Sequence, residues 1–404
     1  MRHLLPVILL FSCTFLGAQD KEYAYRIISD LASPKYCGRG YTHHGNNKSA
    51  QYIVTALKNI QVPNIQIQKF DIPVSVIKSV SSIKFDTISA MPGYEVMIHS
   101  GSCSIKGTFP IVKVTVNNLS TLFMPNNGNS FIMLDTSITE NTKYSSDVQL
   151  LIQKNPINAK GYILIKEKPI MQQIQSETNS WVILETTMKF MEAKNITLTI
   201  KSKHYDAYKT QNIIATIPGE IDTVIAFSAH YDHLGELGSC YFPGANDNAS
   251  GDAMVLDIAR ELSTTKPHYT LAFLFFTGEE LGLLGSYYFV NNPTFSLKKI
   301  KLLVNLDVIG SGEDGIAVVN GSVFTDISDK LDSLNNKMKL VSSIQKRGKA
   351  FNSDHAPFSE KGVKAIFIYA KGKTGPYHHP DDLPNKLSMA KYNEIVKLIL
   401  NLIK

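Results

Sequence analysis

Side chains capable of metal chemistry gather in the stretch 227–252, which reads FSAHYDHLGELGSCYFPGANDNASGD. His230 and Asp232 come directly after an apolar run, and Asp247 lies inside a turn rich in Gly and Asn. Imidazole and carboxylate groups at a strand end and in a loop are typical of metal sites, because functional residues concentrate on loops held by a rigid scaffold. The stretch therefore predicts a metal-binding cluster but does not by itself define a reaction.

Three later apolar runs also end in ligand-type residues. The run LAFLFF is followed by Glu279 and Glu280, the run KLLVNL by Asp307, and the run KAIFIYA leads to YHHPDD, which contains His378 and His379. The carboxyl ends of parallel strands open on the same edge of a sheet, so we expect these side chains to meet. Any one of them alone is more often structural, but clustered carboxylates repel one another unless a cation neutralises them.

The donor set fits two zinc ions. Zinc accepts both imidazole and carboxylate ligands, and its catalytic sites keep a position for water. Two ions ~3.5–4 Å apart need a bridging carboxylate, and Asp247 in its tight turn is the natural candidate. We expect His230 and Asp307 at one ion, and Glu280 and His378 at the other.

The remaining polar residues of these motifs have predicted supporting roles. Glu279 is free to act as general base on a water that bridges the zinc ions. Asp232 can accept the other ring N–H of His230 and so fix its tautomer. His233 is interpreted as a neighbour of the site, and His379 stays open as an alternative to His378.

Secondary-structure patterns divide the chain into regions. Strand-like and helix-like segments alternate over 206–404, which predicts an α/β catalytic domain with a mostly parallel central sheet flanked by helices. Two amphipathic helices are expected within 19–70, the N-terminal part of the same domain. Short β-branched runs separated by turns fill 71–205 and predict a β-rich insertion.

The N-terminus and the overall charge restrict where the protein acts and what it binds. Residues 1–18 contain Arg2, an apolar run and a small-residue exit at Ala18, which predicts a signal peptide and a secreted or periplasmic protein. In the alternative, Cys13 is the lipidated residue of a lipoprotein. No later run approaches the ~18 apolar residues of a membrane span. The net charge of +6 is not gathered into the basic patch that nucleic-acid binding requires.

The ordered motifs resemble those of a known family. SAHYDHLG, PGANDNASG, FTGEELGLLGS, NLDVIG, SDHAPF and YHHPDD are similar to the motifs of secreted co-catalytic zinc aminopeptidases of the bacterial leucine aminopeptidase type. Glutamate carboxypeptidase II, the transferrin receptor and the glutaminyl cyclases are related branches. The resemblance implies two zinc ions, the ligands named above and Glu279 as base. It also implies contacts of Asp354 and His355 with the substrate pocket or its surroundings, a role for Tyr377 near the oxyanion, and a protease-associated (PA-like) insertion.

The sequence therefore predicts a metalloaminopeptidase acting on peptides with a free N-terminus. Three alternatives stay open: a glutaminyl cyclase-like enzyme with a single zinc, a non-catalytic peptidase-like binding protein, and a carboxypeptidase acting on acidic dipeptides. The last would need arginine-rich carboxylate recognition, and the catalytic half has few arginines, Arg260 and Arg347.

Overall fold

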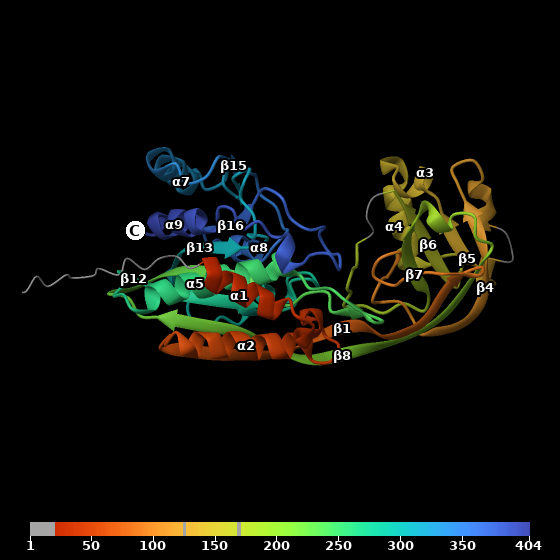
Figure 1. Cartoon of the computed structure of the whole chain (residues 1–404), viewed down its shortest axis with the longest axis horizontal. Helices are drawn as coiled ribbons and strands as arrows, with labels where there is room; N and C mark the ends of the chain where they lie inside the picture. Colours follow the sequence, from red (N-terminus) through yellow and green to blue (C-terminus); the bar gives the residue numbers. More distant parts are fainter. Residues whose placement is uncertain (1–20, 124–126, 168–170) are drawn as a thin grey trace, which may run out of the picture.

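The computed structural model describes residues 21–123, 127–167 and 171–404, which form two lobes joined by a pair of long strands (Figure 1). These strands, β1 (Asn64–Phe85) and β8 (Asn195–Ile217), pair antiparallel along their length. The predicted signal peptide and Cys13 lie outside the described residues. None of the helices in the described ranges has the length and apolar character needed to span a membrane.

The larger lobe is built on a mixed sheet whose centre is parallel. The strands β16, β13, β9 and β12 run parallel to one another, while β14 and β8 lie antiparallel to their neighbours in this group. The order across the sheet is β15 (Ile344–Lys346), β14 (Ile316–Val319), β16 (Ala365–Ala370), β13 (Ile300–Leu306), β9 (Ile221–His230), β12 (Tyr269–Phe276), β8. The α/β class with a large central sheet is confirmed.

Helices cover both faces of this sheet, which explains why its central strands are almost continuously apolar. In β12, Phe273 and Phe275 pack into one core while Leu274 and Phe276 pack into the other, following the two-residue alternation of a strand. The first core receives α1 (Lys21–Leu31), α2 (Gly45–Asn59), α5 (Ser250–Ser263), α7 (Thr325–Met338) and α9 (Tyr392–Leu402). The second receives α6 (Leu284–Asn291) and α8 (His355–Glu360).

The C-terminal segment 384–403 is not one continuous helix. A short 3₁₀ turn, η8 (Pro384–Lys386), comes first, and Met389 then adopts a left-handed backbone with φ of 48°. A left-handed residue cannot continue a right-handed helix, so α9 begins only at Tyr392.

The smaller lobe is itself an α/β arrangement. Its strands β4 (Ile105–Val114), β5 (Phe131–Leu134), β6 (Gly161–Lys166) and β7 (Val182–Thr187) are parallel, and β3 (Val96–Ile98) lies antiparallel at the edge. The helices α3 (Thr136–Thr139) and α4 (Ser145–Lys154) belong to this lobe, and β2 (Ile88–Ser89) pairs with the end of β1. The β-branched runs expected over 71–205 thus form a sheet, but the pattern did not reveal the helix α4.

Candidate metal centre

The strand ends of the larger lobe bring the predicted ligands to one edge of the sheet. His230 is the last residue of β9 and lies opposite Phe276, the last residue of β12. Glu279 and Glu280 follow shortly after β12, so they lie at the same edge of the sheet as His230. Asp307 follows directly after β13. The parallel strands thus end together, and their terminal side chains converge as the sequence predicts.

Asp247 lies between two groups of ligand-type side chains. Its Oδ1 is 3.3 Å from Nε2 of His230, and the same nitrogen lies 3.4 Å from Oδ1 of Asp307. Its Oδ2 is 3.2 Å from Nε2 of His378, which lies 3.0 Å from Oε2 of Glu280. The two oxygens of one carboxylate therefore face two separate groups, each with an imidazole and a further carboxylate.

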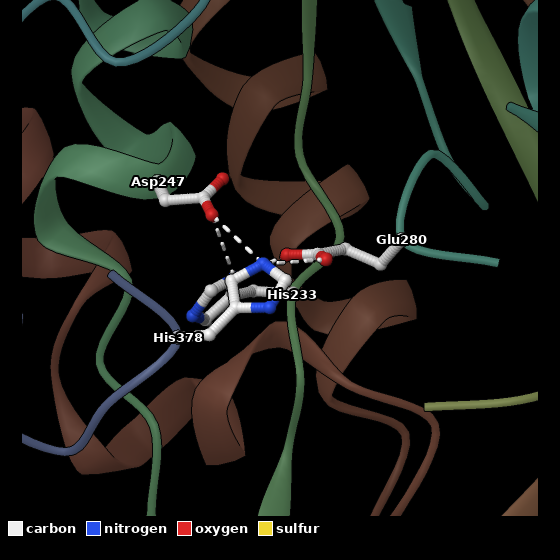
Figure 2. A group of neighbouring side chains, drawn as sticks. All are labelled: His233, Asp247, Glu280 and His378. Atoms are coloured by element: carbon white, nitrogen blue, oxygen red, sulfur yellow. Dashed lines mark hydrogen bonds and ion pairs between the residues drawn. The ribbon is translucent and has the colours of Figure 1, made fainter. Parts of the chain in front are cut away.

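His233 joins the second of these groups (Figure 2). Its Nδ1 lies 2.6 Å from Oε1 of Glu280 and 4.0 Å from Oδ2 of Asp247. The ligand-type atoms of His233, Asp247, Glu280 and His378 all lie within 4.8 Å of one another, as do those of His230, Asp247 and Asp307. The sequence interpretation of His233 as a mere neighbour therefore underrated its contact with Glu280.

The electrostatics of both groups show that the side chains require positive charge. Oδ2 of Asp247, Oδ1 of Asp307 and Nε2 of His378 are buried and make no hydrogen bond. Burial alone would lower the pKa of His230, but Glu279 and Asp307 raise it well above its usual value. Burial likewise opposes protonation of His378, but Glu280 and Asp247 raise its pKa well above the usual value. Buried ligand atoms without hydrogen bonds and clustered carboxylates are what a bound cation would satisfy, and the imidazole and carboxylate donors fit zinc.

Glu279 lies beside the two groups of ligand-type side chains but belongs to neither of them. Its Oε2 lies 3.9 Å from Nε2 of His230. Burial raises the pKa of Glu279 well above its usual value, and the charges of Asp307 and Glu280 add to this effect against the opposing influence of His230. A carboxyl group that is buried beside the ligands and prone to hold a proton is suited to accept and return one.

Asp232 supports the centre through both its backbone and its side chain. Nδ1 of His230 lies 3.2 Å from the Asp232 carbonyl oxygen and 3.8 Å from the carboxylate Oδ1. The carbonyl, rather than the predicted carboxylate, is thus within hydrogen-bonding distance of the ring. The carboxylate accepts hydrogen bonds from the Tyr41 hydroxyl at 2.8 Å and from the Glu279 backbone N–H at 3.2 Å.

The turn that presents Asp247 is anchored from two distant segments. The carboxylate of Asp382 accepts hydrogen bonds from the backbone N–H groups of Asn246 and Asp247 at 2.9 and 3.0 Å. On the other side, the buried guanidinium of Arg39 donates to the carbonyls of Gly244 and Asp247 at 2.7 and 2.9 Å. The Asp247–Asn248 peptide in this turn is cis. These contacts fix the backbone that carries the shared carboxylate.

The other predicted residues, Asp354, His355, Tyr377 and His379, differ in their burial and in their contacts. Asp354 is fully buried and accepts a hydrogen bond from the Ser286 hydroxyl, and burial raises its pKa to about 7. His355 is buried on α8 with its ring centroid 5.5 Å from that of Phe367, and burial lowers its pKa to about 4.

Tyr377 is 53% exposed and stacks on His378, with 3.8 Å between the ring centroids. The His379 imidazole accepts from the Asp381 backbone N–H at 3.1 Å and faces the Tyr94 ring, outside both groups.

Two cavities adjoin the centre. A recess of about 230 Å³ is lined by His230, Asp247, Glu279 and Asp307 and, beyond them, by Val308, Arg347, Asn352, Phe367, Tyr369 and Tyr377. A larger cleft of about 720 Å³ lies between the lobes, where α4 and His99 of the smaller lobe face the segment that begins at Glu280. The site thus has a small recess on one side and a wide cleft on the other.

Several supporting residues could not be recognised from the sequence. Arg39, Asp382 and Ser353 contact the centre from segments far apart in the chain, the last by donating its hydroxyl to Oδ2 of Asp307 at 2.8 Å. Asp382 is the last residue of the YHHPDD motif and Ser353 is the first residue of SDHAPF, so membership of a motif was the available signal for these two residues.

Comparison with known proteins finds a family match in the larger lobe. The model of peptidase family M28 matches residues 212–403, the region that carries every residue of the two groups. This match covers slightly less than half of the chain. The expected resemblance is thereby confirmed.

Curated aminopeptidases are similar to part of this chain. Aminopeptidase YwaD from Bacillus subtilis is 29% identical over 212 residues, which cover 50% of this chain and 46% of that protein. A probable leucine aminopeptidase from Trichophyton verrucosum is 26% identical over 239 residues, covering 55% of this chain and 63% of the relative. The chain thus aligns with about half to two thirds of the length of these relatives.

A solved structure shows the same fold over nearly the whole chain. BSAP, a zinc aminopeptidase from Bacillus subtilis, superposes with a TM-score of 0.73 at 21% identity, covering 95% of this chain and 94% of that one. Because the likeness spans both lobes, the smaller lobe is part of the shared fold.

Proposed function

We propose that the protein is a zinc-dependent aminopeptidase that removes N-terminal residues from peptides. The observation that carries this proposal is the position of Asp247, whose two carboxylate oxygens face separate groups containing His230 and His378. A carboxylate shared in this way is what a pair of metal ions requires. The M28 family match and the curated aminopeptidase relatives support the reaction class.

Each predicted ligand has a place in this proposal. His230 and Asp307 would hold one zinc ion, Glu280 and His378 the other, and Asp247 both. His233 contacts Glu280 closely and would orient that carboxylate. Two zinc ions bound there would supply Lewis acidity, which activates water and polarises the peptide carbonyl.

Glu279 would move the proton in this reaction. Its buried carboxylate takes a proton from the attacking water and passes it to the leaving amine, so that the new carboxyl group and the new N-terminus form with protons balanced. The hydrogen bond from its backbone N–H to Asp232 fixes the start of the segment that carries it. Tyr377 lines the recess and stacks on His378, and in this proposal it would donate a hydrogen bond to the developing oxyanion.

The shape of the site favours removal of the N-terminal residue. The recess beside the ligands holds about 230 Å³, which is below the roughly 300–1,000 Å³ typical of small-molecule pockets. It has room for one residue but not for an extended chain. A free amino group would lie among the carboxylates of the centre, whereas the rest of the peptide would leave through the interlobe cleft.

The smaller lobe would shape that exit. The Gln172 backbone N–H donates to the His378 carbonyl at 3.1 Å, and the Tyr94 ring meets His379, so the lobe contacts the loop that carries one predicted ligand. We propose that residues 71–205 act in this way as a PA-like insertion that restricts access. This role predicts that long peptides are cleaved more slowly than short ones.

We also propose that the protein acts outside the cytoplasm after removal of residues 1–18. The support is the basic, apolar and small-residue pattern of that segment. N-terminal sequencing of the mature protein should begin at residue 19; a lipid-modified Cys13 at the N-terminus would instead support the lipoprotein alternative.

Activity and zinc content measured on the same samples test the proposed function. Wild type should release amine from aminoacyl-nitroanilides and from peptides with free N-termini. Glu279→Gln should lower kcat by about 10²–10⁴-fold, the range typical of general acid–base groups, at unchanged zinc content. Glu220→Gln is the matched control, because Glu220 is exposed and lies just before the opposite end of β9.

Other outcomes would favour the alternatives. Release of ammonia from N-terminal glutamine with one zinc per chain would indicate a glutaminyl cyclase. Cleavage of N-blocked acidic dipeptides would indicate a carboxypeptidase. A zinc-loaded wild type that acts on none of these substrates would indicate a binding protein, and full activity of Glu279→Gln would rule out Glu279 as base.

A further inference from the structure

The recess beside the metal ligands contains a guanidinium group with no acidic partner. Arg347 lines this recess together with Asn352 and the aromatic residues Phe367, Tyr369 and Tyr377. Among residues 21–123, 127–167 and 171–404, no carboxylate lies within ion-pair distance of Arg347. Its neighbour Lys346, in contrast, pairs with Asp329 and Asp332 at 2.8 and 2.7 Å.

The position of Arg347 is fixed by both its backbone and its side chain. Its backbone N–H donates to Val318 at 2.8 Å, and its carbonyl accepts from the Ser322 backbone N–H at 3.1 Å. Nη1 donates to the Tyr369 hydroxyl at 3.0 Å, and the guanidinium carbon lies 5.6 Å from the centre of the Tyr369 ring. A guanidinium has five N–H donors in a planar fork, so most of them stay available after this bond.

The chemistry of the group indicates what it would bind. Planar guanidinium forks match carboxylates with two parallel hydrogen bonds, and such charge-assisted bonds are among the stronger ones in proteins. Phe367 and Tyr369 are two positions apart on β16, with ring centroids 5.5 Å apart. These rings form an apolar wall that would pack on the aliphatic part of a bound side chain. The recess thus offers an apolar wall and a cationic end.

We propose that Arg347 binds the carboxylate of an acidic N-terminal side chain, so that the enzyme prefers peptides beginning with Glu or Asp. This inference rests on the proposed aminopeptidase function. If the scissile carbonyl lies at the ligand groups of Asp247 and Asp307, the N-terminal side chain branches from the adjacent carbon and enters the recess that these residues line.

The test compares aminomethylcoumarin derivatives of Glu, Gln and Leu. Glu and Gln have nearly the same shape, so their ratio of kcat/KM isolates the charge. Wild type should prefer Glu over Gln by about tenfold to a hundredfold, as expected for a hydrogen bond between charged groups. Arg347→Met should reduce this ratio to about one, and Arg347→Lys should restore part of it.

Lys349→Met is the matched control. Lys349 lies in the same segment and carries the same charge, but it sits over Phe351 at 4.9 Å and does not line the recess. This variant should keep the wild-type preference for Glu. Zinc content should be equal in all four proteins.

Three results would overturn the inference without touching the proposed function. They are a wild-type ratio of Glu to Gln near one, a preference for Glu that survives Arg347→Met, and an acidic preference found at the second residue of Leu-X peptides. Absence of hydrolysis of every aminoacyl derivative would instead remove the proposed function, and this inference with it.

Discussion

Replacing Arg39 with Met should destabilise the larger lobe and loosen its metal centre together. The guanidinium is fully buried and donates hydrogen bonds to five carbonyl groups, those of Leu31, Tyr231, Pro243, Gly244 and Asp247, at 3.3, 3.1, 2.6, 2.7 and 2.9 Å. The side chain thereby joins the end of α1, the residue after β9 and the turn that presents Asp247.

The expected loss in free energy of unfolding follows from the carbonyl acceptors that Arg39→Met leaves without a donor. Each buried unsatisfied group costs about 1–3 kcal/mol, but the five share one donor and relax together, so the costs do not add. Removing one member of a buried charged network typically costs about 3–5 kcal/mol, which we take as the expected loss in free energy of unfolding. Because the Asp247 carbonyl is released, zinc affinity should also fall by about 10–100-fold, as for other residues that orient ligands.

Urea unfolding of the zinc-free protein and calorimetric zinc titration measure the two effects. Arg26→Met is the matched control, because Arg26 is exposed on α1 and should change the free energy of unfolding by less than about 0.5 kcal/mol. Arg39→Lys keeps the charge with fewer donors and should fall between wild type and Arg39→Met. If Arg39→Met unfolds within about 1 kcal/mol of wild type and binds zinc equally well, the proposed anchoring of Asp247 is wrong.

Two further predictions concern the turn and an isolated histidine. Gly244 has a φ of 56°, and a Cβ there would overlap the Asp247 carbonyl oxygen and the His233 ring. Gly244→Ala should therefore lower the free energy of unfolding by about 1–3 kcal/mol and weaken zinc binding; equal zinc affinity in calorimetry would contradict this. Burial lowers the pKa of His355 to about 4 from 6.5, so the unfolded chain takes up a proton that the folded chain does not between these pH values. The free energy of unfolding should fall by about 3 kcal/mol more in wild type than in His355→Gln as the pH drops from 7 to 4, and parallel curves in urea unfolding of the zinc-free proteins would refute this.

Much of the centre could be predicted because its ligands follow directly after apolar strands. His230, Asp307 and the Glu279–Glu280 pair each end a run that must be a buried strand, and the parallel arrangement of such strands brings their ends together. Residue type and order along the chain were therefore sufficient to assemble them.

The supporting contacts could not be predicted because they depend on how distant segments pack. Arg39 reaches the Asp247 turn from the N-terminal region, and nothing in its surrounding sequence marks it as buried. His233 was set aside because it adjoins Asp232, yet the turn after β9 directs its ring to Glu280. The same holds for the Asp232 carbonyl, since backbone acceptors have no signature in the sequence.

The topology of the smaller lobe could not be predicted from the sequence pattern either. Short β-branched runs indicate strands, but the parallel order of β4 to β7 depends on crossover connections, and the helix α4 in one of them has just one buried residue, Ile152. A helix with so small a buried face has a weak periodic pattern.

Anomalous X-ray scattering at the zinc edge, recorded from crystals of the zinc-loaded wild type, tests the central claim most directly. The proposed centre should give two peaks ~3.5–4 Å apart, one beside His230 and Asp307 and the other beside Glu280 and His378, with Asp247 between them. A single peak, or two peaks that Asp247 does not join, would contradict it.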